Sequence, residues 1–110
     1  MKEKYKYDYT SGDFKEQYYM LEDYGGDRLL LVAAVDRGNL NIARHAIKHG
    51  ASVNANNGLP LKTAIQKENL HIVKYLVQNG ADVNIDRGLP IMAAVRKGNL
   101  DIMKYLTTGR

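Results

Sequence analysis

The chain contains no cysteine and no tryptophan, and only two of its 110 residues are proline. The lack of cysteine excludes a disulfide framework and any metal site built from thiolates. No apolar run approaches the roughly 18 residues that a membrane-spanning helix needs. The first residues, MKEKYKYDY, have no apolar stretch behind their lysines and do not resemble a secretory signal. These absences predict an intracellular protein with a cytoplasmic address and no membrane contact.

The sequence also lacks the motifs of the common enzyme classes. It has no glycine-rich phosphate loop, no nucleophile elbow and no paired carboxylates in an apolar setting. The formal net charge of +4 is modest and does not by itself indicate a nucleic-acid binder. A hydrophobic share of 45% and a charged share of 25% are ordinary for one folded domain. The sequence therefore predicts a protein that is not an enzyme and needs no cofactor.

What the sequence does contain is a repeat with a period of 30 residues. Leu59-Pro60 recurs at Leu89-Pro90, and Asn39-Leu40 recurs at Asn69-Leu70 and Asn99-Leu100. A fixed period of roughly 20–50 residues is typical of a solenoid, in which each unit buries its apolar face against the next. The spacing therefore predicts stacked units with one continuous core.

The repeated blocks carry a family resemblance. They read LPLKTAI, ENLHIVKYLV and GADVN in the middle unit, and LPIMAAV and GNLDIMKYL in the last. They resemble the ankyrin repeat, whose consensus runs roughly TPLHLAA, GHLEVVKLLL and GADVN. The resemblance covers Leu29 to about Thr108 and implies an all-α solenoid of stacked helix-turn-helix units. Thirty-residue units also look similar to those in ankyrin arrays of giant DNA viruses, and such a source would place the protein in the host cytoplasm.

The period divides the chain into an N-terminal part and three repeats. The segments are a tyrosine-rich arm with a degenerate capping half-repeat (1–27), two complete repeats (28–57 and 58–87) and an incomplete third repeat (88–110). Residues 14–23 are predicted to form a helix capped by Asp13. The alternative for this region is a β-hairpin that turns at Ser11-Gly12.

Each repeat is expected to hold two helices joined by a tight turn. The first helices are expected at about 31–37, 61–67 and 91–97, and the second helices at about 40–49, 70–79 and 100–108. Gly38 and Gly98 stand where a first helix ends in a left-handed residue, which glycine adopts without steric cost. Asn39, Asn69 and Asn99 follow at the N-caps of the second helices.

The connections between repeats are short, with only residues 55–58 and 85–88 before the next first helix. They predict compact turns in place of the projecting β-finger of ordinary ankyrin repeats. Pro60 and Pro90 are expected to open the first helices, where a missing N–H costs nothing. Glu68 stands where the other repeats have glycine, so it is expected at positive φ at a cost of about 1 kcal/mol.

Basic residues recur at the same period, at Arg37, Lys67 and Lys97. A charge that recurs on a solenoid forms a stripe on one side, here expected on the concave face at the ends of the first helices. Together with the neighbouring turns, this stripe predicts a contact surface for another protein that carries an acidic patch. Its residues are Arg37, Asn56, Asn57, Gln66, Lys67, Asp86, Arg87, Arg96 and Lys97.

Two other interpretations of the basic stripe stay open. It could bind nucleic acid electrostatically, with the alternating Tyr5, Tyr7 and Tyr9 of the arm stacking on bases. Alternatively, the cations only solvate the C-terminal ends of helices, where the helix dipole favours positive charge.

His45 and His49 have the spacing of a metal-ligand pair, four residues apart on one helix. No third ligand follows in the sequence pattern, so a structural role is preferred and no metal is predicted.

The last repeat has no following unit to cover it. Leu100, Met103 and Thr107 are expected at this open end, together with Met92. An uncovered apolar surface tends to find a partner. The sequence therefore predicts either a homodimer through the C-terminal repeat or a longer parent chain with further repeats.

Overall fold

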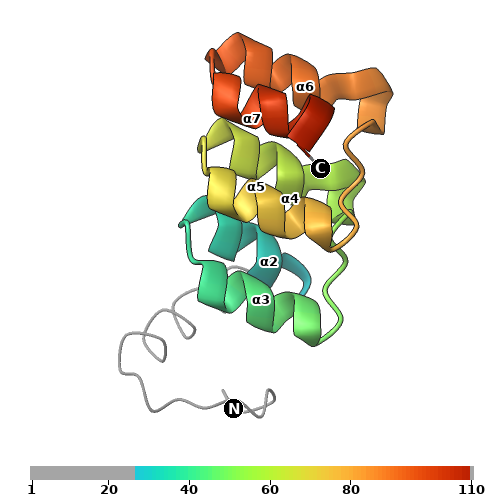
Figure 1. Ribbon diagram of the computed structural model, residues 1–110. Coiled ribbons are helices and arrows are strands. Elements are labelled where there is room, and N and C mark those ends of the chain that lie inside the picture. Colours follow the sequence, from blue (N-terminus) through green and yellow to red (C-terminus); the bar gives the residue numbers. More distant parts are fainter. Residues whose placement is uncertain (1–26, 110) are drawn as a thin grey trace. The chain divides into compact units, whose positions relative to one another are not determined.

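The computed structural model describes residues 27–109, which form helices joined by short turns and hold no strand (Figure 1). The elements are α2 (Asp27–Asp36), α3 (Leu40–Lys48), α4 (Ala55–Gln66), α5 (Leu70–Gln78), α6 (Ile85–Lys97), α7 (Leu100–Lys104) and the π-helical turn η1 (Tyr105–Gly109). No helix among these residues is long and apolar enough to cross a membrane. The arm predicted at 1–26, with its capping helix or hairpin, lies outside the described residues.

The chain forms two compact units, Met1–Ala51 and Ser52–Arg110. In the first unit α2 packs against α3. In the second unit α4 packs against both α5 and α6, and α7 packs against both α6 and α5. Helices α4 and α6 thus form one layer of this unit, and α5 and α7 form the other (Figure 1). Ala34, Ala64 and Ala94, which are one period apart, are fully buried and belong to the core.

The asparagine caps predicted from the sequence are confirmed. The side-chain oxygens of Asn39, Asn69 and Asn99 accept hydrogen bonds from the backbone N–H three residues further on, at 3.0, 3.1 and 3.0 Å. Gly38 and Gly98 both have φ of 71°, as expected for left-handed residues that end a helix. Each second helix therefore starts at an asparagine cap, and the first helices before Asn39 and Asn99 stop at a left-handed glycine.

The bounds of α3 and α5 agree with the predictions to within one residue. Helices α4 and α6 begin at Ala55 and Ile85, six residues before the predicted starts, because each includes the left-handed turn that precedes it. Differences also occur at the two ends of the described region. Helix α2 begins at Asp27, about four residues before the predicted start. In later repeats a glycine and a proline set the start of the first helix, but residues 27–31 contain neither and the helix extends backward. At the other end, the helix predicted at 100–108 is present, but it changes from the α-helix α7 to the π-helical η1 at Tyr105.

The two connections in the second unit are compact turns, as predicted. Asn56, Asn57 and Gly58 have φ of 52°, 58° and 78°, and the three residues at 86–88 have φ of 51°, 61° and 90°. Each turn is therefore a short left-handed segment, closed by a hydrogen bond from the glycine N–H to the carbonyl four residues earlier. The right-handed helix resumes directly after the glycine, so Pro60 and Pro90 lie in its first turn.

Candidate functional site

A network of polar side chains joins the two left-handed turns of the second unit. Asp86 Oδ2 accepts hydrogen bonds from Lys62 Nζ at 3.1 Å and from Asn57 Nδ2 at 2.9 Å. The bond from Lys62 and then the bond from Asn57 hold the pKa of the Asp86 carboxyl below its usual value. Asn54 adds two bonds, to the Gly80 carbonyl at 3.0 Å and from the Asp82 N–H at 2.9 Å. Asn57 and Asp86, both predicted contact residues, are therefore held in place by each other.

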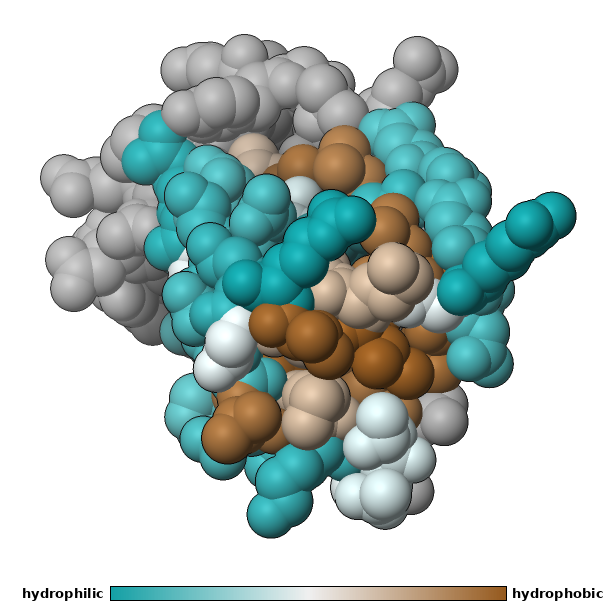
Figure 2. All heavy atoms as spheres, turned by 90° about the horizontal axis from the view of Figure 1, so that it is seen from above, coloured by the Kyte–Doolittle hydropathy of each residue, from teal (hydrophilic) through white to brown (hydrophobic). Residues whose placement is uncertain are grey.

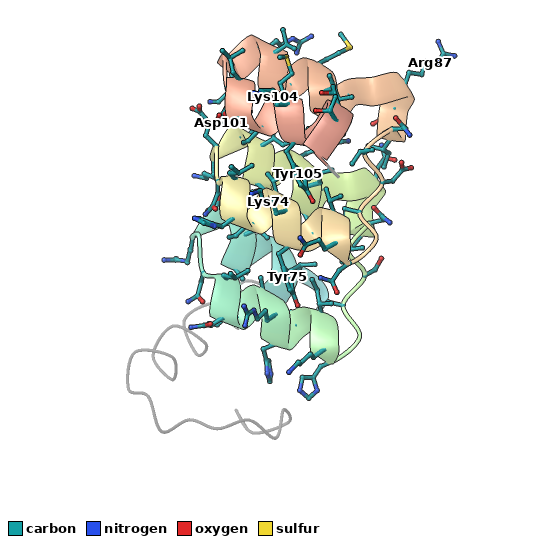
Figure 3. The ribbon with its side chains drawn as sticks, viewed as in Figure 1. Lys74, Tyr75, Arg87, Asp101, Lys104 and Tyr105 are labelled. Atoms are coloured by element: carbon teal, nitrogen blue, oxygen red, sulfur yellow. The ribbon has the colours of Figure 1, made fainter. Side chains whose placement is uncertain are left out.

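Arg87 follows Asp86 in the second turn and points away from the helices (Figure 3). It has φ of 61° and is exposed, so an arginine occupies a backbone conformation that glycine or asparagine adopts more easily. Strained residues of this kind cluster at functional sites, where the strain is retained for a purpose. Its counterpart one period earlier, Asn57, is of the type that tolerates this conformation.

Glu68 ends the first helix of the middle repeat with φ of 55°, which confirms the predicted positive φ. Its side chain reaches the following repeat. The carboxylate accepts a hydrogen bond from Asn99 Nδ2 at 3.3 Å and lies 3.9 Å from Lys97 Nζ. The contact with Lys97 is long and half exposed, so it stabilises the fold little.

Replacing Glu68 by glycine is expected to raise the free energy of unfolding by about 0.5 kcal/mol. Relief of the left-handed strain, about 1 kcal/mol, exceeds the loss of an exposed ion pair. Urea unfolding of Glu68→Gly and Glu68→Ala separates the backbone strain from the side-chain contacts, because alanine removes the contacts but keeps the strain. A Glu68→Gly protein less stable than the original chain would show that the contact with Asn99 outweighs the strain.

A groove lies between the two first helices of the second unit. Its volume is about 360 Å³. It is lined by Lys62 and Gln66 from α4 and by Leu89, Ala93, Arg96 and Lys97 from α6. The groove thus brings together three predicted contact residues, Gln66, Arg96 and Lys97.

Sequence reasoning missed the other three lining residues, Lys62, Leu89 and Ala93. Lys62 lies one helical turn before Gln66, and Ala93 lies one turn after Leu89 and one turn before Lys97. Side chains four apart on a helix share one face. That spacing places each of them on the same helix face as a predicted contact residue, but only the packing of α4 against α6 shows that the two faces line one groove.

The remaining predicted residues lie on the surface of their own units. Lys67 is the exposed C-cap of α4, and Asn56 is exposed in the first left-handed turn. Arg37 belongs to the first unit, where it lines a shallow hollow of about 300 Å³ with Gly38 and Asn39. A single stripe that includes Arg37 stays a prediction.

His45 is fully buried in the first unit, and its ring centroid lies 4.3 Å from that of His49. Burial, followed by the nearby positive charges of His49 and Lys48, lowers the pKa of His45 to about 4. Its burial supports the structural role predicted for it. Within residues 27–109, no three His, Cys, Asp or Glu side chains come together as a possible metal site.

The end of the second unit formed by α6 and α7 exposes apolar side chains. Met92, Val95 and Leu100 are 51%, 56% and 65% exposed, and hydrophilic side chains surround an apolar centre on this face (Figure 2). The prediction for Met92 and Leu100 is confirmed. The prediction for Met103 is wrong in part, because this residue is half-buried, and Val95 was missed.

One comparison with known proteins gives a match. A family model described as ankyrin repeats (3 copies) matches residues 14–87 and, in a second placement, residues 31–109. No curated protein and no solved structure matches the chain significantly. The intracellular address and the likeness to viral arrays stay predictions.

Proposed function

Because the chain belongs to the ankyrin-repeat family, whose repeats are in general protein–protein interaction modules, we propose that it binds an acidic protein through its basic concave surface. The term basic surface here means Gln66, Lys67, Arg96 and Lys97, with the turns at Asn56-Asn57 and Asp86-Arg87. Arg37 is proposed as a contact residue of the first unit by itself. The family is typically a non-enzymatic scaffold, and the proposal needs no cofactor.

The groove between α4 and α6 is the observation that carries this proposal. Three of its six lining residues are cations, and no carboxylate is among the six. Rigid helices present these side chains, and the Asp86 network holds the adjoining turn before any partner arrives. A surface organised in advance loses less conformational freedom on binding, which favours affinity.

Reversing two charges of the basic surface, Lys67→Glu with Arg96→Glu, is expected to weaken partner binding at least tenfold. Opposed like charges slow association and destabilise the complex. The free energy of unfolding should change by only about 0.5 kcal/mol, because both side chains are exposed. The original chain and the variant are each used to capture proteins from a lysate of the source organism. The amounts of each captured protein are then compared by mass spectrometry.

A matched control reverses Arg44 of α3 and Lys74 of α5, two exposed residues that lie outside the basic surface. Lys74 Nζ lies 5.7 Å from the centre of the Tyr105 ring, which indicates a local role. A partner retained by this control and lost by the Lys67/Arg96 variant supports the proposal. Equal retention by both variants would contradict it.

The nucleic-acid alternative uses the same cations together with the tyrosine arm, which lies outside the described residues. It predicts binding to single-stranded oligonucleotides that falls as a steep power of salt concentration. The groove has no aromatic lining residue on which a base could stack, which favours a protein partner.

A second proposal concerns the apolar end face, defined by Met92, Val95 and Leu100. We propose that it pairs with the same face of a second copy, because three large apolar side chains are more than half exposed there. Asp101 and Lys104 lie on the exposed side of α7, so antiparallel pairing of two α7 helices would bring opposite charges together (Figure 3).

Leu100→Lys is therefore expected to convert a dimer into a monomer at micromolar concentration, because it places two cations in the interface. Sedimentation velocity measures this change, with Gln78→Lys of α5 as the exposed control. A monomeric original chain would contradict the dimer.

A further inference from the structure

We propose that the α4–α6 groove binds a short acidic peptide segment by taking one of its apolar side chains between the two helices. This inference rests on the proposed function and names the chemistry of its partner. It distinguishes a linear segment with an apolar anchor from a folded acidic surface, which would need only the exposed cations.

The floor of the groove is apolar. Leu89 and Ala93 of α6 are half-buried, and the facing wall carries the aliphatic stems of Lys62 and Gln66. A volume of about 360 Å³ lies at the lower end of the roughly 300–1,000 Å³ of small-molecule pockets. The groove is therefore suited to one or two side chains. A partner that offered charge alone would leave this apolar floor in contact with water.

Three lining residues of the groove, Lys62, Arg96 and Lys97, carry positive charge. Within residues 27–109 Arg96 makes no ion pair, whereas Lys62 is bound to Asp86 at 3.1 Å. Lys97 has its carboxylate partner at 3.9 Å, the outer limit for such a pair. Arg96 is thus the cation available for a carboxylate from outside, which its planar guanidinium can bind through two hydrogen bonds.

The distance along α6 sets the spacing in the peptide. Leu89 and Arg96 are seven residues apart on one helix, a rise of about 10 Å. An extended peptide covers this length in about three residues, at roughly 3.3–3.6 Å each. The preferred segment therefore has an apolar residue and an acidic residue about three positions away.

The test uses fluorescein-labelled peptides and the full chain, with binding measured by fluorescence anisotropy. The first peptide has one leucine flanked by glutamates on both sides, and the second has alanine in place of that leucine. The third keeps the leucine and replaces every glutamate by glutamine. We expect the first peptide to bind at least tenfold more tightly than either of the others. It alone offers both a leucine for the apolar floor and a carboxylate for Arg96.

Two variants of the protein locate the site. Ala93→Leu fills the floor without changing charge, and Arg96→Gln removes the cation without filling the groove. Each is expected to weaken binding of the first peptide at least fivefold. Lys74→Gln of α5, on the other layer, serves as the control and should leave binding unchanged. Circular dichroism confirms that each variant is folded, and Leu89→Ala replaces Ala93→Leu if the latter fails this check.

Equal binding of the leucine and alanine peptides, or full binding by Ala93→Leu, would overturn the inference. A failure of all three peptides to bind the protein would overturn it as well. A different result contradicts the proposed function: unchanged protein capture after charge reversal at Lys67 and Arg96. If charge reversal abolishes capture of the partner but Ala93→Leu leaves binding unchanged, the protein recognises an acidic surface and not an anchored peptide.

Discussion

Lowering the pH from 7.5 to 4.5 is expected to reduce the free energy of unfolding by about 2 kcal/mol through His45 alone. The pKa of this imidazole falls from 6.5 to about 4 in the folded chain, chiefly because it is buried. The unfolded chain therefore binds a proton between these two values while the folded chain does not. The contribution of His45 is intact above pH 6.5, is lost as the pH falls toward 4, and changes no further below that.

Urea unfolding at a series of pH values measures this effect, and NMR titration of the His45 ring measures the pKa directly. His45→Tyr introduces the residue found one and two periods later, at Tyr75 and Tyr105, which does not titrate in this range. This variant should lose the pH dependence, whereas His71→Gln, at an exposed position, should keep it. The same slope in His45→Tyr and the original chain would contradict the assignment.

Gly58→Ala is expected to reduce the free energy of unfolding by about 2–3 kcal/mol, and Gly88→Ala by only about 1–2 kcal/mol. The two glycines are one period apart and both have left-handed φ, so the backbone strain of an added Cβ is similar. Their surroundings differ. A Cβ at Gly58 would lie 2.8 Å from Ile85 Cδ1, whereas a Cβ at Gly88 would meet nothing within 4 Å.

The pair is therefore a matched comparison in which only the packing changes. Thermal or urea unfolding of both variants gives the difference, and Gly58→Ala combined with Ile85→Ala should recover part of it because the clashing methyl group is removed. Equal losses at the two positions would show that Ile85 moves aside without cost.

The local structure could be predicted because its causes lie within a few residues of sequence. Asparagine caps the backbone three residues ahead, and glycine takes a left-handed conformation at a helix end. Asn69 therefore caps α5 and Gly98 ends α6 in a left-handed conformation, as the neighbouring sequence predicts. Glu68 was predicted to have positive φ for the same reason, because the turn requires it whatever residue stands there.

The left-handed turns were predicted only as short connections. Each turn has three left-handed residues, and glycine accounts for one of them. Asp86 and Arg87 prefer the left-handed conformation less strongly than glycine does. In the structure, Asp86 is held by Lys62 and Asn57, residues 24 and 29 positions earlier. Sequence patterns at short range contain no information about such a partner.

The sequence by itself determined the period, the turn and asparagine cap between each first and second helix, and the alternation of the two helices, because each depends on local backbone preference and on apolar spacing. The tertiary structure alone decided that Lys62 and Leu89 line the same groove as Arg96, and that Val95 is exposed while Met103 is half-buried. These outcomes depend on how closely one repeat approaches the next. That approach is set by the packing of many side chains at once, and no single motif encodes it.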